Sequence, residues 1–210
     1  MSVDIQFMIV SKFIDTNCFN FKEGVANEYL ARDGNVEGFS VAVSITRPHS
    51  KGILRLRSSD PFDYPLLDPK YLTEKRDIGT FITGIRLWEK FMHTQTMKDL
   101  GTDINQMKMS FCSQYEYRSN AYWECFVRHL AVTVYHVSST CKMGVVNDPT
   151  TVVDSDLRVK GIKGLRVVDT SVFPAITSGN TYAPVIMVAE KAADLIRGQD
   201  SVKHLKQNLP

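Results

Sequence analysis

The sequence predicts an α+β chain in which antiparallel strands and amphipathic helices come first and a single strand–loop–helix unit comes last. Three observations lead to this prediction. Apolar residues alternate with small or polar ones at 39–45, they recur at spacings of three and four from Asp77 onward, and they form a continuous run at 165–168 before a helical stripe. We place the boundary between the two parts near residue 150 and treat 201–210 as a tail.

The strands of the first part are predicted from alternation and from turn residues. Residues 4–10 resemble a strand, and 39–45 have the period of a half-buried strand. Leucines alternate with arginines at 54–57. The runs 39–45 and 54–57 are therefore expected to form a long antiparallel hairpin with one solvent-exposed face. The polar stretch 22–37 is expected to be a surface segment. The three prolines within 60–71 predict an irregular connection.

Two helices are predicted in the first part. The first runs from Asp77 to Met92, and Ser119 is a good N-cap for the second. Cys112 and Cys125 flank an aromatic-rich segment between them. The spacing leaves a disulfide and a pair of buried thiols equally open, because pairing cannot be deduced from sequence.

The last part changes character. The apolar run 165–168 is typical of a strand covered on both faces, and it ends in Asp169. A helix follows that Asn180 or Thr181 can cap and Gly198 can terminate. One such unit cannot make a sheet without partner strands. We therefore expect the chain to be incomplete.

Composition excludes several classes of function. The chain has 210 residues, 43% hydrophobic and 23% charged, with a net charge of +2. Those values are ordinary for a globular protein. Its basic residues form no block, so a nucleic-acid role is not expected, and no apolar stretch has the length of a membrane span.

His136 is the first candidate for chemistry. It follows the β-prone run 132–135 and precedes a cluster of small polar residues, a position that suits a general base. A structural histidine is the alternative. A serine hydrolase is disfavoured because no G-x-S-x-G elbow occurs. A metal pair of His136 and Cys141 lacks further ligands, so no metal site is predicted.

Asp169 and the start of the last helix form the second candidate. Ligands of open α/β sheets bind outside the carboxyl ends of strands, where Asp169 stands. The helix start at 178–181 favours negative charge, such as that on the pyrimidine side of a reduced flavin. A purely structural cap by Asn180 is the alternative, and both roles are compatible.

Four passages carry a family resemblance: residues 46–56, 60–72, 135–144 and 164–184. In combination they resemble the C-terminal portion of the glucose–methanol–choline (GMC) oxidoreductases, and are most similar to the animal glucose-dehydrogenase-like branch. The resemblance implies a substrate-binding domain up to about residue 150, built on an antiparallel sheet backed by helices. It also implies that 151–200 belong to an incomplete FAD-binding α/β domain.

The resemblance further implies roles for individual residues. His136 matches the position of the family's catalytic base, and Asn180 matches its second active-site residue, which orients the alcohol oxygen. The hydrogen on carbon then leaves as hydride to flavin N5. Asp169 and Thr170 match positions near the FAD ribityl chain and phosphates.

Thr181 and Tyr182, together with Asn180, match the helix start that faces the flavin. The implied partners are FAD, an alcohol or sugar substrate, and an electron acceptor such as a quinone. The resemblance also favours an extracellular or secreted location.

Two departures from the family pattern qualify these implications. Residues 137–141 read Val-Ser-Ser-Thr-Cys where the family has Pro-Val-Gly-Thr-Cys, and no G-x-G-x-x-G occurs in the sequence. We therefore expect an FAD-binding portion to lie upstream. The alternatives are a truncated, non-catalytic or binding protein without flavin, and a flavoprotein lyase of the same fold.

Overall fold

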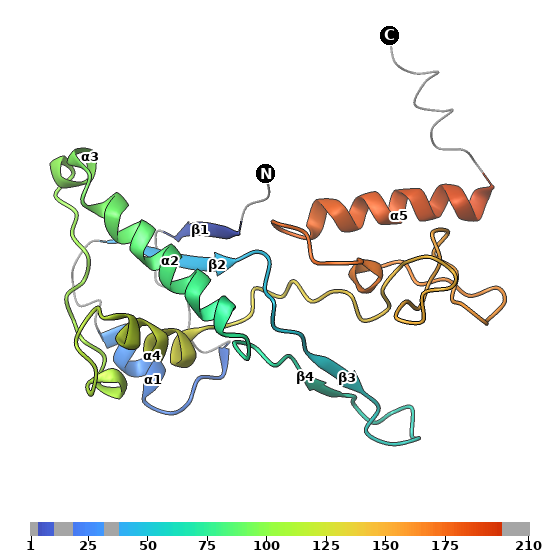
Figure 1. The fold of residues 1–210 in the computed structure, drawn as a ribbon, viewed down its shortest axis with the longest axis horizontal. Helices are drawn as coiled ribbons and strands as arrows, with labels where there is room; N and C mark the ends of the chain where they lie inside the picture. The colour runs from blue at the N-terminus through green and yellow to red at the C-terminus, as the bar shows by residue number, and fades with distance from the viewer. Residues whose placement is uncertain (1–3, 11–18, 32–37, 199–210) are drawn as a thin grey trace, which may run out of the picture. The chain divides into compact units, whose positions relative to one another are not determined.

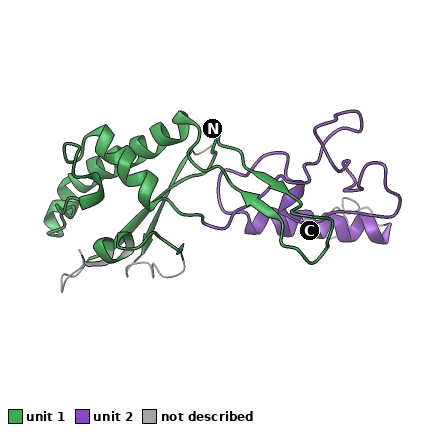
Figure 2. Ribbon diagram, turned by 90° about the horizontal axis from the view of Figure 1, so that it is seen from below, with its two compact units in different colours: residues 1–133 green, residues 134–210 purple. Residues whose placement is uncertain are grey.

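A computed structural model describes residues 4–10, 19–31 and 38–198 of the chain. These residues divide into two compact units, 1–133 and 134–210 (Figure 2). The predicted tail 201–210 and the end of the predicted surface segment 22–37 lie outside the described residues. The α+β class is confirmed, because small antiparallel sheets and helices both occur.

The first sheet pairs two strands that are distant in sequence. Strand β1 (Ile5–Val10) runs antiparallel to β2 (Ser40–Ile45), with Ile5 opposite Ile45. Both strands were predicted, but their pairing was not. The predicted hairpin of 39–45 with 54–57 is wrong, because alternation identifies the buried face of a strand and not its neighbour.

The second sheet is a short ribbon. Strand β3 (Ile53–Arg55) pairs antiparallel with β4 (Leu66–Asp68), and Ile53 lies opposite Asp68. The prediction of a wholly irregular connection at 60–71 is therefore corrected. Strand β4 lies between Pro65 and Pro69. Both prolines stand just outside the strand, so neither has to donate a backbone hydrogen bond to the neighbouring strand.

Helix α2 (Lys75–Met92) confirms the predicted first helix and crosses the β1–β2 pair (Figure 1). The Trp88 ring lies 5.4 Å from that of Phe7 and 6.3 Å from that of Phe39, measured between centroids. Gly84 faces the sheet so closely that an added Cβ would stand 2.6 Å from Val43 Cγ1. The helix can therefore sit this low on the sheet only with glycine at that position.

Helix α4 (Asn120–Leu130) confirms the second helix, and the Ser119 hydroxyl accepts a hydrogen bond from the Tyr122 N–H at 3.1 Å. A disulfide joins Cys125 on this helix to Cys112 on η2 (Ser110–Cys112), with Cα atoms 5.9 Å apart. The structure thus resolves the two alternatives for this pair. The disulfide packs in a cluster of aromatic and aliphatic side chains: Tyr122, Trp123, Ile82, Ile85, Phe111, Tyr117 and Phe126.

Two further α-helices lie among the described residues of the first unit. Helix α3 (Gln95–Asp99) directly follows α2. Helix α1 (Val25–Ala31) lies within the polar stretch that was predicted to be only a surface segment. The carboxylate of Glu28 accepts hydrogen bonds from both the N–H and the hydroxyl of Ser110. A long-range polar anchor of this kind leaves no signal in hydrophobic periodicity, so the helix was missed.

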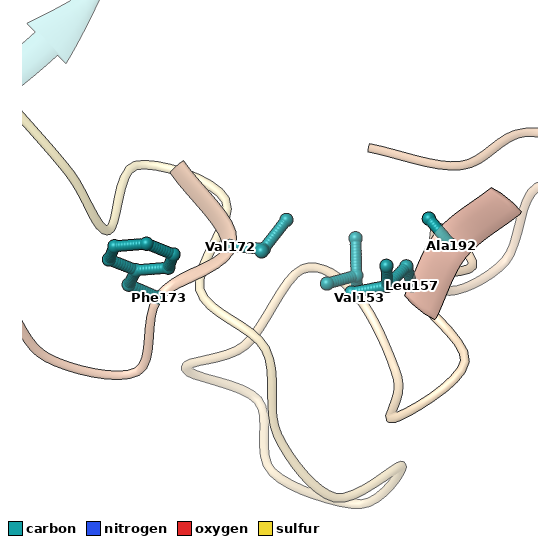
Figure 3. Packing of buried hydrophobic residues seen from close by; sticks show 5 residues of the cluster. All are labelled: Val153, Leu157, Val172, Phe173 and Ala192. Atoms are coloured by element: carbon teal, nitrogen blue, oxygen red, sulfur yellow. The ribbon is translucent and has the colours of Figure 1, made fainter. Parts of the chain in front are cut away.

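The second unit contains η3 (Thr170–Val172) and α5 (Tyr182–Arg197). The predicted last helix is confirmed, and Gly198 terminates it in the left-handed conformation at φ 68°. A small core lies beneath α5 (Figure 3), made of Val153, Leu157, Val172, Phe173 and Ala192. Within the described residues, no helix is long and apolar enough to cross a membrane.

The predicted strand at 165–168 is not a β-strand in this structure. The segment is extended, and it forms one isolated bridge between Arg166 and Arg158. Backbone hydrogen bonds also join Val159 N–H to Leu165 O and Val167 N–H to Leu157 O. A strand that is covered on both faces needs parallel strands beside it, and the described part of the chain supplies no such strand for this segment.

A buried carboxylate anchors the loop between β2 and β3. Asp77 is only 2% exposed, and its oxygens accept hydrogen bonds from the N–H groups of His49 and Ser50, each at 2.8 Å, and from the Ser50 hydroxyl. Burial alone would raise the pKa of Asp77. The three donated hydrogen bonds outweigh it and hold the pKa below its ordinary value.

We predict opposite effects for two Gly→Ala substitutions in α2. Gly84→Ala should lower the free energy of unfolding by about 1–3 kcal/mol, because the new methyl group collides with Val43 and Ile5. Gly79→Ala should raise it by up to about 1 kcal/mol, since its Cβ meets nothing within 4 Å and alanine is the better helix former. Urea unfolding of both variants checks this, and equal effects would contradict the packing.

Asp77→Asn should lower the free energy of unfolding by about 1.5–3 kcal/mol at pH 7, because it weakens hydrogen bonds to a charged acceptor. A carboxyl whose folded pKa is lowered stabilises the fold above its unfolded pKa of about 3.9. That stabilisation is lost as the pH falls through the folded pKa. The difference between wild type and variant should therefore shrink below about pH 4. The exposed Asp99→Asn is the matched control and should leave the free energy of unfolding at pH 7 nearly unchanged.

Candidate functional site

The segment that follows His136 is held by backbone hydrogen bonds to η3. The N–H groups of three residues donate to three consecutive carbonyls: Ser139 to Thr170 at 3.2 Å, Cys141 to Ser171 at 2.9 Å, and Met143 to Val172 at 2.9 Å. The Thr170 hydroxyl adds a hydrogen bond to Val137 O at 2.9 Å. This pairing attaches the chain directly after His136 to η3, and η3 contributes Val172 to the core of the second unit.

The predicted β-prone run before His136 is not a strand. Val132 and Val134 are exposed and have no strand partner in the described part of the chain. Tyr135 and Ser139 instead adopt left-handed backbone conformations, at φ 61° and 70°. Residues other than glycine rarely do so, and such strain persists only where the surroundings enforce it. His136 therefore lies on a sharply bent loop.

The imidazole of His136 lies against the beginning of α5. Its Nδ1 atom is 3.1 Å from the hydroxyl oxygen of Thr181. Thr181 is 6% exposed, and His136 is half-buried. Asn180, which is exposed, directly precedes Thr181. The structure thus brings the predicted base to the same helix start as the predicted second active-site residue.

Asp169 and Thr170 hold the neighbouring turn in place. The exposed Asp169 is the N-cap of η3, and one of its carboxylate oxygens accepts a hydrogen bond from the Ser171 N–H at 2.7 Å. Thr170 directs its hydroxyl to Val137. The exposed carboxylate of Asp169 can also accept a hydrogen bond from a ligand hydroxyl, which is the chemistry that a ribityl chain presents.

The first turn of α5 fits a negatively charged group. The N–H groups of a helix's first turn have no partner within the helix, and the positive end of the helix dipole lies there. The Thr181 side chain, which stands at the N-cap, makes no capping hydrogen bond to them. Tyr182, 74% exposed, begins the helix. The residues present therefore fit the pyrimidine side of a flavin, as the resemblance implies.

One group of possible metal ligands forms among the described residues: Cys112, Cys125 and His129. Both sulfurs belong to the disulfide, whereas cysteine binds metals as the thiolate. The His129 Nδ1 atom also lies 2.8 Å from the carbonyl of Cys125. This cluster is therefore structural in the oxidised chain, and Cys141 is a free thiol.

The contact of Thr181 with His136 was not anticipated from the sequence, which linked Thr181 only to the cofactor. One signal was available. Pro184 stands three residues after Thr181 and so removes one of the two N–H groups that an N-cap hydroxyl usually binds. The loss of that donor favours another partner for the hydroxyl.

Comparisons with known proteins identify the family of the chain. Residues 48–189 match the family model described as GMC oxidoreductase. The chain is 38% identical over 176 residues to glucose dehydrogenase (FAD, quinone) of Drosophila pseudoobscura pseudoobscura, covering 84% of this chain and 28% of that protein. It is 40% identical over 166 residues to the mitochondrial choline dehydrogenase of Homo sapiens, covering 79% of this chain and 27% of that protein.

Solved structures give the same result. Formate oxidase of Aspergillus oryzae RIB40, described in connection with FAD modification, aligns with a TM-score of 0.68 at 30% identity over 79% of this chain and 28% of that one. Pyridoxine 4-oxidase from Mesorbium loti aligns with a TM-score of 0.67 at 29% identity over 78% of this chain and 30% of that one. The chain spans less than a third of the length of these relatives. The resemblance carried by the four sequence passages is confirmed, and the chain belongs to the GMC oxidoreductase family.

Proposed function

We propose that this chain supplies the catalytic-base side of an FAD-dependent oxidoreductase that acts on the CH–OH groups of alcohols or sugars. The observation that carries the proposal is the contact between His136 and the start of α5. It places an imidazole, an exposed amide side chain and the positive end of a helix at one locus. That is the set of groups needed to deprotonate a hydroxyl beside a hydride acceptor that becomes anionic on reduction.

Each residue has a distinct task in this proposal. His136 takes the proton of the substrate hydroxyl, and Asn180 orients the substrate oxygen. Bound FAD supplies the hydride acceptor at N5. The first turn of α5, from Tyr182, would hold the pyrimidine side of the flavin, and Asp169 and Thr170 would hold its ribityl chain.

The proposal includes an FAD-binding portion beyond these 210 residues and an acceptor such as a quinone. Exposed apolar side chains on α5 support a further polypeptide partner. Met187 is 66% exposed and Ile196 is 64% exposed. Large apolar side chains that are exposed on one helix would be stabilised by burial against another surface. The name of the Drosophila relative, which includes FAD and quinone, supports the cofactor and the acceptor.

We also propose an oxidising location, extracellular or in the secretory pathway. The Cys112–Cys125 disulfide supports it, because disulfides persist in oxidising compartments and are rare in the cytosol. Free-thiol labelling of protein from its native source tests this proposal. Labelling of Cys112 and Cys125 without prior reduction would contradict it.

We predict that His136→Ala reduces turnover by a factor of about 10²–10⁴ in a flavin-loaded protein that contains this chain, because it removes the base. Flavin absorbance should be retained, since the proposal gives His136 no role in holding FAD. His93→Ala is the matched control, an exposed histidine at the end of α2. Turnover that stays at the wild-type level in His136→Ala would contradict the assignment of His136 as the base.

The 210-residue chain purified alone should carry no flavin and show no dehydrogenase activity. It lacks the G-x-G-x-x-G loop that binds the pyrophosphate in dinucleotide-binding folds. An absorbance spectrum of the purified chain is the measurement. A flavin band that co-purifies with the chain would show that these residues hold the cofactor without further help.

A further inference from the structure

Resting on the proposed function, we infer that the ribbon of β3 and β4 is an arm that docks against an apolar surface of the FAD-binding portion. We call residues 53–68 the arm, which comprises both strands and the turn that joins them. Among the described residues, β3 and β4 form a two-stranded sheet of their own, separate from β1 and β2 (Figure 1). A two-stranded ribbon without further packing is marginally stable in water at best. The arm therefore gains stability from a partner surface.

One face of the arm is aliphatic. Leu54 lies directly opposite Leu67 in the register of the ribbon, so both side chains fall on the same face. Leu56 stands two residues after Leu54 and, by the alternation of an extended chain, falls on that face too. The exposed fractions are 50% for Leu54, 82% for Leu56 and 69% for Leu67. Single exposed leucines are ordinary, but several on one face of a short ribbon form an apolar patch, which marks an interaction site.

The turn at the end of the arm adds two aromatic rings. Phe62 is 91% exposed and Tyr64 is 86% exposed. The polar groups of the turn bind one another: the Ser58 hydroxyl donates to Asp63 Oδ2 at 2.6 Å, and the Phe62 N–H donates to Asp60 Oδ1 at 2.9 Å. These hydrogen bonds hold the turn in one conformation while its rings remain exposed. A surface that is ordered before it binds loses less conformational freedom on binding.

The base of the arm is attached to the start of α2. The buried carboxylate of Asp77 accepts hydrogen bonds from the N–H groups of His49 and Ser50, just before β3. Gly52 lies so close to the end of β4 that an added Cβ would stand 2.6 Å from the carbonyl oxygen of Asp68. The arm therefore has a fixed base, whereas its aliphatic face and its turn are exposed.

The charges of the arm disfavour a lipid surface and a second copy of the chain. The arm carries two positive side chains and three negative ones: Arg55, Arg57, Asp60, Asp63 and Asp68. It lacks the excess of positive charge with which interfacial segments bind anionic headgroups. A second copy that met the turn across a two-fold axis would bring Asp60 and Asp63 close to the same carboxylates, and like charges repel.

The comparisons favour the rest of the polypeptide as the partner. The arm lies within residues 48–189, the stretch that matches the family model. The chain spans less than a third of its Drosophila and human relatives. A surface in a region that the family shares is best explained by a partner that each relative carries, and the remainder of its own chain is such a partner. Under the proposed function, that remainder holds FAD.

The test is hydroxyl-radical footprinting of the flavin-loaded protein that contains this chain, read by peptide mass spectrometry. Synthetic peptides of the same sequence give the oxidation rates of fully accessible rings. Phe62 and Tyr64 should be oxidised at least about tenfold more slowly in the protein than in the peptide, because the core of an interface excludes water. Tyr122, which is 1% exposed, is the internal reference for a buried ring.

Oxidation of Phe62 and Tyr64 at the rate of the peptide would overturn the inference. Protection that appears only with vesicles of phosphatidylcholine and phosphatidylserine would also overturn it, because the occupant is then a lipid surface. Protection that grows with protein concentration would overturn it as well, because the occupant is then a second copy of the chain.

A pair of variants tests the aliphatic face. Leu56→Asp should lower the melting temperature of the flavin-loaded protein by at least about 5 °C, because a charge must then be buried at the interface. Leu100→Asp is the matched control, a leucine that is 69% exposed at the end of α3, and it should leave the melting temperature nearly unchanged. Equal shifts in the two variants would overturn the inference. If Leu56→Asp fails to fold, footprinting of the wild type decides.

Footprinting and turnover separate this inference from the proposed function, because protection of the arm does not depend on catalysis. A protected arm together with normal turnover in His136→Ala overturns the proposed function alone. An arm that is oxidised at the rate of the peptide, together with lost turnover in His136→Ala, overturns the docking of the arm alone.

Discussion

The candidate site depends on the hydrogen-bonded pairing between the segment after His136 and η3. Three backbone N–H groups of that segment donate to Thr170, Ser171 and Val172, and Val172 is fully buried in the core beneath α5. The loop that carries His136 is therefore tied to that core although it contains no helix or strand. The strained conformations of Tyr135 and Ser139 are sustained by this attachment.

Local patterns predicted the helices well and the strand pairings poorly. The helix ending at Met92 and the Ser119 cap were correct, because amphipathic spacing and capping depend on neighbours in sequence. The partner of β2 is β1, whose paired residues are 30 to 40 positions away in sequence, and no alternation pattern encodes such a choice. The stretch at 165–168 was assigned as a strand from its residue types alone. Strand formation also needs neighbouring strands, which the described residues do not include.

The candidate site was predictable as a set of residues but not as a geometry. His136 and Asp169 were candidates from their local sequence, and the family resemblance implied roles for them and for Asn180. The structure gathers their segments in one unit. The partner of His136 could not be derived, because it depends on how a hydroxyl turns at a helix start. Asp77 was also missed as the anchor of the His49–Ser50 loop, since a buried carboxylate that binds backbone N–H groups has no periodic signature.

Helix α5 begins without the side-chain cap that threonine usually provides, which costs such a helix about 1 kcal/mol. Several features offset that loss. Pro184 has the backbone angle of a first turn, Arg197 lies at the negative end of the dipole, and Gly198 closes the last turn in the left-handed conformation. Ala192 packs into the core midway along the helix. The helix is therefore stabilised mainly through its middle and its C-terminal end, which leaves the hydroxyl at its N-terminal end for His136 and its first N–H groups for an anion.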